Sequence, residues 1–515
     1  MKLLKTLFLV GASALSLAGC GPDDVASPGT SGNVTVNNTT TGGTGGTTGG
    51  STATVTAATG CPTIDDPQGL KDDGTITGPT GTWRVCSLPS RINKSINLPK
   101  IAGLLYQLSG RVNVGTDGGF TKTAADTNVT LSIEPGVIVF GGTGVSWLAV
   151  NRGNKINAVG TAAKPIIFTS RDNILGLNTD TSQGQWGGIV LMGRGKVTDC
   201  TSGSTAAGTC ERQTEGAADP ALFGGADDAD NSGKLSYVQI RYSGYVLGAN
   251  VELQSLTGEG VGSGTQISYI QTVNSSDDGS EWFGGSPTVK YYIAVAADDD
   301  SLDVDTGARA NFQYGLLIQR TGSGDALLEI DSNGFETETP RTDLKISNFT
   351  MMQPAVSASN EAADQASTLF RGNSDVTLYN SIIAAPNNEC IRMNGSGATP
   401  ATLTPRSVVM TCNATKYLGT GTYTAAQVTT AFGAGANSNR DDFTSTLAST
   451  YVNGANEAGV TATSVASLGS SFSATTNIGA VKDSADNWWA IWTCNSTTAN
   501  FGSGNSGVCT SLPTN

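Results

Sequence analysis

The feature that most constrains the fold is a sequence pattern in residues 267–285 that returns 22 positions later, in residues 289–307. The pairs of matched residues at this spacing are Tyr269 and Tyr291, Asp277 and Asp299, Asp278 and Asp300, and Glu281 and Asp303. A looser third copy follows in residues 314–331. A fixed period of this size is typical of a solenoid, in which each repeat stacks on the one before it. The sequence therefore predicts stacked coils.

Stacking would place the matched carboxylates in columns, with neighbouring strands about 4.8 Å apart. Because LEID at 328–331 matches LDVD at 302–305, one column would hold Glu281, Asp303 and Glu329. Two carboxylates at that distance repel by roughly 3 kcal/mol at an effective dielectric constant near 20. The side chains must therefore splay into solvent, keep protons through raised pKa values, or share a bound cation.

Calcium is the cation that this residue set favours, because oxygen ligands without histidine or cysteine select hard ions. The candidate ligands on the repeat are Asp277, Asp278, Glu281, Asp299, Asp300, Asp303 and Asp305. The alternative is a solvated acidic face in which Asp and Ser close turns.

A second candidate calcium loop begins at Asp228 and continues through Asp230 and Ser232. Its spacing matches the opening of an EF-hand loop, but Gln239 stands where that loop places a bidentate Glu. The alternative is an ordinary Asp/Asn turn before a strand.

The N-terminus has the pattern of an export signal. Residues 1–19 combine Lys2 and Lys5 with an apolar run too short to span a bilayer. The run ends in Leu-Ala-Gly-Cys20, which resembles the lipobox of bacterial lipoproteins and predicts acylation of Cys20. Residues 20–60 are nearly all small and polar, so they predict a flexible tether. We expect an outer-membrane lipoprotein displayed at the cell surface.

Composition excludes several function classes. The chain has 29 Lys and Arg against 43 Asp and Glu, a net charge of −14, which disfavours nucleic acid as a partner. It contains no histidine among its 515 residues. Catalysis by Ser-His-Asp or Cys-His systems and zinc bound by histidine are therefore excluded.

The strand pattern predicts an all-β chain. Gly is abundant, aromatic residues are few, and short β runs end at Gly, Asn or Pro from about residue 130 onward. We expect an N-terminal cap at 61–129, a solenoid at 130–414 and a C-terminal cap region of short mixed structure at 415–515. Within the last region, residues 422–435 predict a short helix.

Three sequence words carry a resemblance: LSIEPG at 131–136, NRGNKINAVGTAAKPIIFTS at 151–170 and QWGGIVLMG at 185–193. In this order they resemble the right-handed parallel β-helix lipoproteins and surface proteins of Gram-negative bacteria, which share the pectate-lyase-like solenoid. The resemblance spans about residues 130–330. It implies the fold and the location more than an activity, because most such proteins have none assigned.

The eight cysteines other than Cys20 fit an exported chain with disulfides. Pairing between sequence neighbours is the simplest arrangement and would pin loops and caps. It gives Cys61–Cys86, Cys200–Cys210, Cys390–Cys412 and Cys494–Cys509.

Two aromatic sets allow a structural and a binding interpretation. Tyr237, Tyr269, Tyr291 and Tyr314 share one repeat position, which favours wall packing over a sugar-binding platform. Trp488, Trp489 and Trp492 cluster beside Cys494. We expect this cluster to seal the end of the solenoid, with exposed carbohydrate or protein binding as the alternative.

Two functions remain open. The first is a binding or accessory protein, calcium-stabilised, whose partner is a polysaccharide or an envelope or secreted protein; the resemblance adds export by type II secretion. The alternative is an enzyme of the pectate-lyase-like fold. A calcium-dependent polysaccharide lyase would use Arg309 or Arg320 as base, and a glycoside hydrolase would use paired carboxylates such as Asp299 and Asp300.

Overall fold

The computed structural model describes residues 54–514 except for short gaps at 216–220, 249–250, 333–336, 357–365, 395–398, 450 and 503–505. The predicted signal sequence, Cys20 and most of the predicted tether lie outside the described residues. None of the helices in the described part of the chain is long and apolar enough to cross a membrane.

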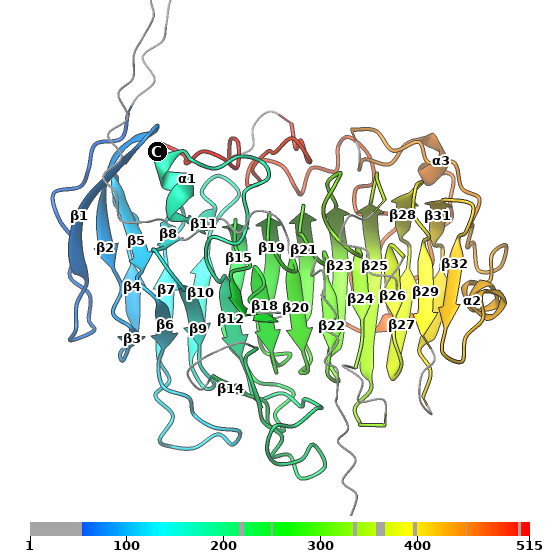
Figure 1. Ribbon diagram of the computed structural model, residues 1–515, viewed down its shortest axis with the longest axis horizontal. Coiled ribbons are helices and arrows are strands. Elements are labelled where there is room, and N and C mark those ends of the chain that lie inside the picture. Colours follow the sequence, from blue (N-terminus) through cyan, green and yellow to red (C-terminus); the bar gives the residue numbers. More distant parts are fainter. Residues whose placement is uncertain are drawn as a thin grey trace, which may run out of the picture. The chain divides into compact units, whose positions relative to one another are not determined.

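The described residues form a parallel β-helix with three walls (Figure 1). The first wall contains β4 (Ile96–Leu98), β7 (Thr130–Ile133), β10 (Lys155–Val159), β27 (Ser374–Tyr379) and β30 (Thr402–Arg406). The second wall contains β2 (Gly81–Ser87), β5 (Leu104–Leu108), β8 (Ile138–Gly141), β11 (Ile166–Ser170), β28 (Ile382–Ala385) and β31 (Val409–Cys412).

Five long strands belong to both of these walls, because each bends midway and pairs with its neighbours on either side of the bend. They are β15 (Gly233–Arg241), β19 (Gln266–Val273), β21 (Thr288–Val295), β23 (Arg309–Ile318) and β25 (Thr342–Met352). The two walls therefore form one sheet of 17 strands, completed by β1 (Lys71–Gly78), which is antiparallel to β2.

The third wall is a separate parallel sheet of 11 strands. Its strands are β3 (Arg91–Ile92), β6 (Arg111–Val114), β9 (Trp147–Val150), β12 (Ile189–Met192), β18 (Leu256–Glu259), β20 (Ser280–Phe283), β22 (Asp303–Asp305), β24 (Leu328–Ile330), β26 (Thr368–Phe370), β29 (Ile391–Asn394) and β32 (Tyr417–Thr420). Two hairpins lie outside the walls: β13 (Arg212–Gln213) with β14 (Leu222–Phe223), and β16 (Val246–Gly248) with β17 (Val251–Glu252).

The core lies inside the three walls and consists of stacked aliphatic and aromatic side chains. Alternation along each strand sends every second residue inward, so Trp282, Val304 and Ile330 stack in the core while their neighbours face outward. The predicted all-β solenoid is confirmed. Its coils begin before residue 130, however, because β2 already pairs in parallel with β5.

The four disulfides have the predicted connectivity: Cys61–Cys86, Cys200–Cys210, Cys390–Cys412 and Cys494–Cys509. The predicted helix is also confirmed, as α2 (Ala425–Phe432), with Thr424 and Gln427 forming a capping box at its start. Val428 and Phe432 of α2 pack on the last core residues and close that end of the β-helix. The remaining helices are short: α1 (Arg171–Leu175), α3 (Ala455–Ala458) and a 3-10 turn at Val465–Leu468.

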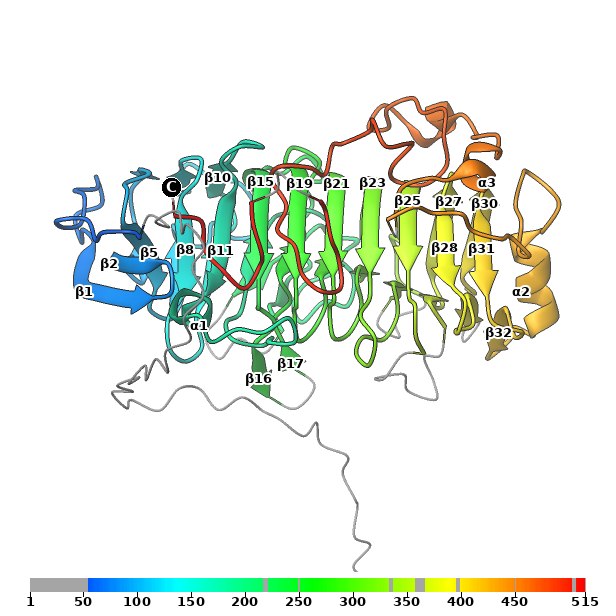
Figure 2. The same ribbon diagram turned by 90° about the horizontal axis from the view of Figure 1, so that it is seen from above.

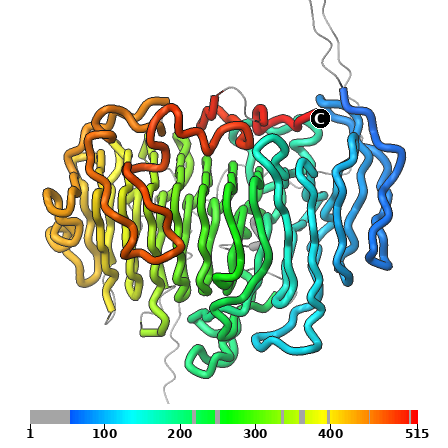
Figure 3. Tube along the Cα trace, turned by 180° about the vertical axis from the view of Figure 1, so that it is seen from behind, coloured from blue at the N-terminus to red at the C-terminus, as the bar shows by residue number. Residues whose placement is uncertain are grey.

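The chain after α2 differs from the expected cap. Residues 451–502 and 506–514, here named the C-terminal strap, run back along the outside of the long strands toward the first coils (Figures 2 and 3). Gln271 exchanges two hydrogen bonds with the backbone of Cys494, at 2.9 and 3.0 Å. Leu512 packs near the other end of the β-helix, against a cluster that includes Trp83 and Phe140.

The tryptophan cluster therefore does not seal the end of the solenoid. Trp492 is fully buried between the strap and the long strands, and Trp488 packs on Tyr291. An outward apolar row on the second wall, including Ile293, Val295 and Leu316, requires this cover. The local sequence gave no sign of which surface the tryptophans would meet.

Candidate metal centre

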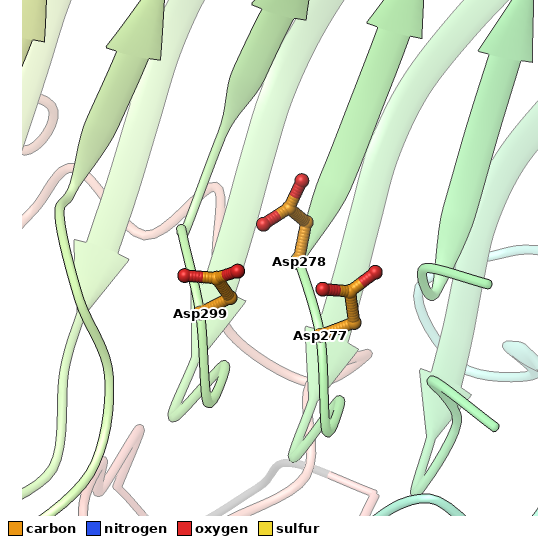
Figure 4. A group of neighbouring side chains, drawn as sticks. All are labelled: Asp277, Asp278 and Asp299. Atoms are coloured by element: carbon orange, nitrogen blue, oxygen red, sulfur yellow. The ribbon is translucent and has the colours of Figure 1, made fainter. Parts of the chain in front are cut away.

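The carboxylates of the repeat gather where each turn enters a strand of the third wall. Asp277 and Asp278 precede β20, and Asp299 and Asp300 precede β22 on the next coil. Figure 4 shows Asp277, Asp278 and Asp299 coming together from these two adjacent turns. The turns stay in register because Asp278 accepts a hydrogen bond from the backbone N–H of Asp300, at 2.9 Å.

The predicted column of acidic residues is present on the outward face of the third wall. Glu281 pairs in register with Asp303, and Asp303 with Glu329. Asp305 lies two residues beyond Asp303 on β22 and faces the same way.

Two groups of carboxylates are compact enough to share a metal ion. One oxygen from each of Asp277, Asp278 and Asp299 lies within 4.8 Å of the others, and the same holds for Asp278, Glu281 and Asp303. Asp278 belongs to both groups and so joins them into one cluster. We name Asp277, Asp278, Glu281, Asp299 and Asp303 the carboxylate cluster.

The cluster is solvated at one side only: Asp299 is exposed and Asp277 and Asp303 are half-buried, whereas the other two members are buried. Asp278 and Glu281 are only 5% and 7% exposed, and Asp300 and Asp305 beside them are also buried. Asp303 Oδ1 is buried and has no hydrogen-bond partner among the described residues. An all-oxygen set with an unsatisfied carboxylate oxygen fits a hard cation such as Ca²⁺.

Burial and mutual repulsion also raise the pKa values of these carboxyl groups. Burial, followed by the neighbouring carboxylates, holds the pKa values of Asp277, Asp278, Glu281 and Asp303 well above their usual range. Asp300 and Asp305 are shifted in the same direction for the same reason, so their pKa values are raised too. Of the three ways to relieve the repulsion, splaying into solvent is open to Asp299 but not to the buried Asp278 and Glu281. Retained protons or a bound cation remain.

One cation of the chain lies at the edge of this face. Arg371 forms ion pairs with Glu329, at 2.6 Å, and with Asp331, at 3.1 Å. Burial raises the pKa of Glu329 to about 7 even though Arg371 acts against it. Among the described residues, no lysine or arginine forms an ion pair with Asp277, Asp278 or Glu281. Asp277, Asp278 and Glu281 therefore lack the compensation that Arg371 gives to Glu329.

Comparison with known proteins gives one match. A family model for the pectate-lyase-like beta helix domain matches residues 118–491. The chain belongs to this family. No curated protein and no solved structure matches it. The match agrees with the three-walled parallel fold described above and assigns no ligand or reaction.

In the second predicted calcium loop of this pectate-lyase-like β-helix, Asp228 is paired with cationic side chains of the chain itself. Asp228 forms ion pairs with Lys196, at 3.0 Å, and with Arg309, at 2.5 Å. The bonds from Arg309 and Lys196 outweigh the effect of burial and lower the pKa of Asp228 to about 2. Burial raises the pKa of Asp230 to about 6. Because two side-chain cations already neutralise Asp228, the EF-hand interpretation of Asp228, Asp230 and Ser232 loses its electrostatic basis.

The arginines proposed as catalytic bases are likewise held by other groups. Arg309 binds Asp228, and Arg320 lies 3.5 Å from Asp298 and donates a 2.7 Å hydrogen bond to Gln183. An ion-paired guanidinium stays protonated and is a poor proton acceptor. Arg309 therefore lacks the setting that a lyase base requires, whereas burial lowers the pKa of Arg320 against the effect of Asp298.

Sequence reasoning missed Arg371, although its position carried a signal. Ile330 pairs with Phe370, so Arg371 continues the column that contains Asp305 and Asp331. The coil between Asp331 and Arg371 holds a long insertion, which hid the match from a search at constant spacing. Glu259 was missed too. It pairs with Phe283 on the same face of the third wall and is fully buried.

Proposed function

We propose that this pectate-lyase-like β-helix is a surface-anchored binding or accessory protein that holds calcium in its carboxylate cluster. The observation that carries the proposal is the shared position of Asp278 in two groups of carboxylate oxygens, each within 4.8 Å. A cation there would relieve repulsion that the surrounding residues leave uncompensated. Extracellular calcium is plentiful enough to fill even sites of 10⁻⁴–10⁻³ M affinity, roughly the range of extracellular modules.

Binding is favoured over catalysis by the state of the candidate catalytic groups. The chain contains no histidine, and Arg309 and Arg320 are held by Asp228 and Asp298. A fold shared with lyases does not by itself confer their reaction. A calcium-dependent lyase or a glycoside hydrolase stays the alternative, to be tested directly.

The place of action follows from the N-terminal sequence. Leu17-Ala-Gly-Cys20 would carry the lipid anchor, and residues 20–60 would hold the β-helix away from the membrane. We propose an outer-membrane lipoprotein on the cell surface, exported by type II secretion as its resemblance to bacterial surface lipoproteins implies.

The partner that suits this surface is a carbohydrate, or an envelope or secreted protein. The net charge of −14 makes the protein repel polyanions unless a cation intervenes. Calcium in the carboxylate cluster would supply that cation for an acidic polysaccharide.

Incubation with acidic polysaccharides tests binding against catalysis. Full-length protein purified in mild detergent is mixed with polygalacturonate or alginate in the presence of calcium or EDTA. We expect calcium-dependent retention of the polysaccharide and no unsaturated uronate in the absorbance spectrum. Formation of that product, abolished by Arg309→Ala, would establish the lyase alternative instead.

A separate measurement tests the anchor. Wild-type protein should partition into the detergent phase of a Triton X-114 extract and incorporate a labelled palmitate analogue. The Cys20→Ser variant should do neither. Equal partitioning of the two proteins would refute lipidation at Cys20.

A further inference from the structure

Four stacked tyrosines mark the bend between the first and second walls. Their ring centroids are 4.3, 4.4 and 5.0 Å apart in chain order, with nearly parallel planes. The stack consists of Tyr237, Tyr269, Tyr291 and Tyr314. This confirms wall packing as one role of the set.

The backbone at these positions is unusual. All four tyrosines have positive φ, between 53° and 64°. For a bulky side chain this conformation costs on the order of 1–3 kcal/mol. Asn348 and Asn380 occupy the same bend on later coils and bind the strap through their side chains, which donate to the backbone oxygens of Asn477 and Thr463. The tyrosines instead offer an aromatic surface at this bend.

The tryptophans of the C-terminal strap pack on the first three rings of the stack, whereas polar strap residues such as Thr475 lie beside the last ring, Tyr314. Trp492 contacts Tyr237 and Tyr269 edge-on, at 5.9 and 6.1 Å, and Trp488 contacts Tyr291 at 5.2 Å. Within the described ranges, Tyr314 has no ring contact except Tyr291. Since Asn348 follows at the next bend, one face of the Tyr314 ring has no aromatic neighbour.

A cavity of about 250 Å³ lies at this end of the stack, between it and the strap. Its aromatic lining consists of Tyr291, Tyr314 and Trp488, and its polar lining includes Thr476, Lys482 and Asp486. This volume is below the roughly 300–1,000 Å³ of pockets for drug-sized ligands, so it suits one small ring. Thr475 and Asn477 line it as well, so the cavity combines one aromatic surface with several groups that can form hydrogen bonds.

We propose that this cavity binds one neutral pyranose unit of a polysaccharide. The C–H face of a pyranose packs on an aromatic ring, and its equatorial hydroxyls both donate and accept hydrogen bonds. Tyr314 with Trp488 offers the aromatic surface. Asp486 accepts from a hydroxyl and Lys482 donates to one, and because their charges are opposite the lining favours a neutral sugar over a uronate or an amino sugar.

This inference rests on the carbohydrate-binding part of the proposed function, but not on calcium. The cavity lies at the bend between the first two walls, whereas the carboxylate cluster lies on the third wall and the turns that lead into it. The two sites can therefore be tested independently. A protein with both would hold a polysaccharide at two places along its surface.

The test uses full-length protein in mild detergent and saturation-transfer NMR with simple glycosides. The probes are methyl glucoside, methyl galactoside and methyl mannoside, with glucuronate and glucosamine as charged counterparts. The blocking variant is Thr476→Trp, which fills the cavity from an exposed position. The matched control is Ser484→Trp, an exposed position on the strap that does not line the cavity.

We expect saturable binding of at least one neutral glycoside, with a dissociation constant on the order of 1 mM, as for a weak single-ring contact. Thr476→Trp should weaken it at least tenfold, Ser484→Trp should leave it unchanged, and both variants should melt like the wild type. Tyr314→Leu, which removes the ring and keeps an apolar side chain, should also abolish binding.

Absence of saturable binding by every neutral glycoside, or equal binding by wild type and Thr476→Trp, would overturn the inference. Stronger binding of glucuronate or glucosamine than of every neutral glycoside would overturn the assigned sugar class. Polysaccharide retention that is calcium-dependent but insensitive to Thr476→Trp would overturn this site and leave the proposed function standing. Glycoside binding that persists in EDTA would support the site even if the calcium proposal failed.

Discussion

Calcium should raise the melting temperature of the protein through the carboxylate cluster. An ion that binds only the folded state stabilises it by RT ln(1 + [L]/Kd). For an affinity of 10⁻⁴–10⁻³ M and about 10 mM calcium, this amounts to roughly 1.4–2.7 kcal/mol. At about 2.1 cal/mol/K per residue, roughly 460 folded residues have an entropy of unfolding near 1 kcal/mol/K, so the melting temperature should rise by about 1.5–3 °C relative to EDTA.

The variant Asp278→Asn gives this prediction a sharper form, because Asp278 belongs to both groups of ligands. In EDTA the variant should melt at or above the wild type, since it loses a buried carboxyl that repels Asp277 and Glu281. The asparagine oxygen can still accept the backbone N–H of Asp300, so the turn keeps its register. In calcium the variant should gain little, and the order of the two proteins should reverse.

Differential scanning calorimetry or intrinsic fluorescence measures both melting temperatures. Asp65→Asn, which makes the same change of charge at an exposed position, is the matched control and should respond to calcium like the wild type. Identical melting of the wild type in EDTA and in calcium would refute the metal site. An Asp278→Asn variant that melts lower than the wild type in EDTA would refute the electrostatic reasoning.

Three further perturbations probe the rest of the molecule. Trp492→Ala should lower the free energy of unfolding by about 3–5 kcal/mol, measured by urea denaturation, because it empties a fully buried site between the strap and the walls. Arg309→Ala should reduce the loss of stability on acidification, measured by urea denaturation between pH 5 and 2. The pKa of Asp228 is about 2 in the folded protein and near 3.9 in the unfolded chain. The stability that ionised Asp228 contributes is therefore fully present above about pH 3.9 and is lost as the pH falls toward 2. Burial raises the pKa of Glu259 to about 8, so the wild type should lose stability as the pH rises from about 4.5 to 8. Glu259→Gln, whose amide oxygen can still accept from Thr214, should reduce that loss by the share of Glu259 while changing little at pH 4, as followed by melting across pH; the other buried carboxyl groups with raised pKa values keep the rest.

Constant spacing made much of the fold predictable. A shift of 22 residues aligned Glu281 with Asp303, and Tyr269 with Tyr291, and the structure pairs them across adjacent strands or stacks their rings. Side chains at one repeat position must share a face, because a parallel ladder repeats every coil in register. The carboxylate and tyrosine columns could therefore be predicted from the sequence alone.

Contacts between distant segments were not predictable in the same way. Arg309 reaches Asp228 from 81 positions away, and Trp492 lies on Tyr237 from the far end of the chain. No local pattern specifies which surface an apolar or charged side chain will meet once it leaves the repeat. For that reason the course of the strap and the ion pairs of Asp228 were not predicted, whereas the carboxylate and tyrosine columns were.

The strictest repeat coincides with the two features that need exact register. Stacked rings lose contact if a coil gains a residue before the bend, and a one-residue slip within β22 would turn Asp303 from the outward face into the core. Coils elsewhere tolerate insertions, such as the long segment between Asp331 and Arg371. The coils that begin at Tyr269 and Tyr291 carry both a tyrosine and ligands of the carboxylate cluster. A constant coil length keeps neighbouring coils in register, and both the tyrosine stack and the carboxylate cluster require that register.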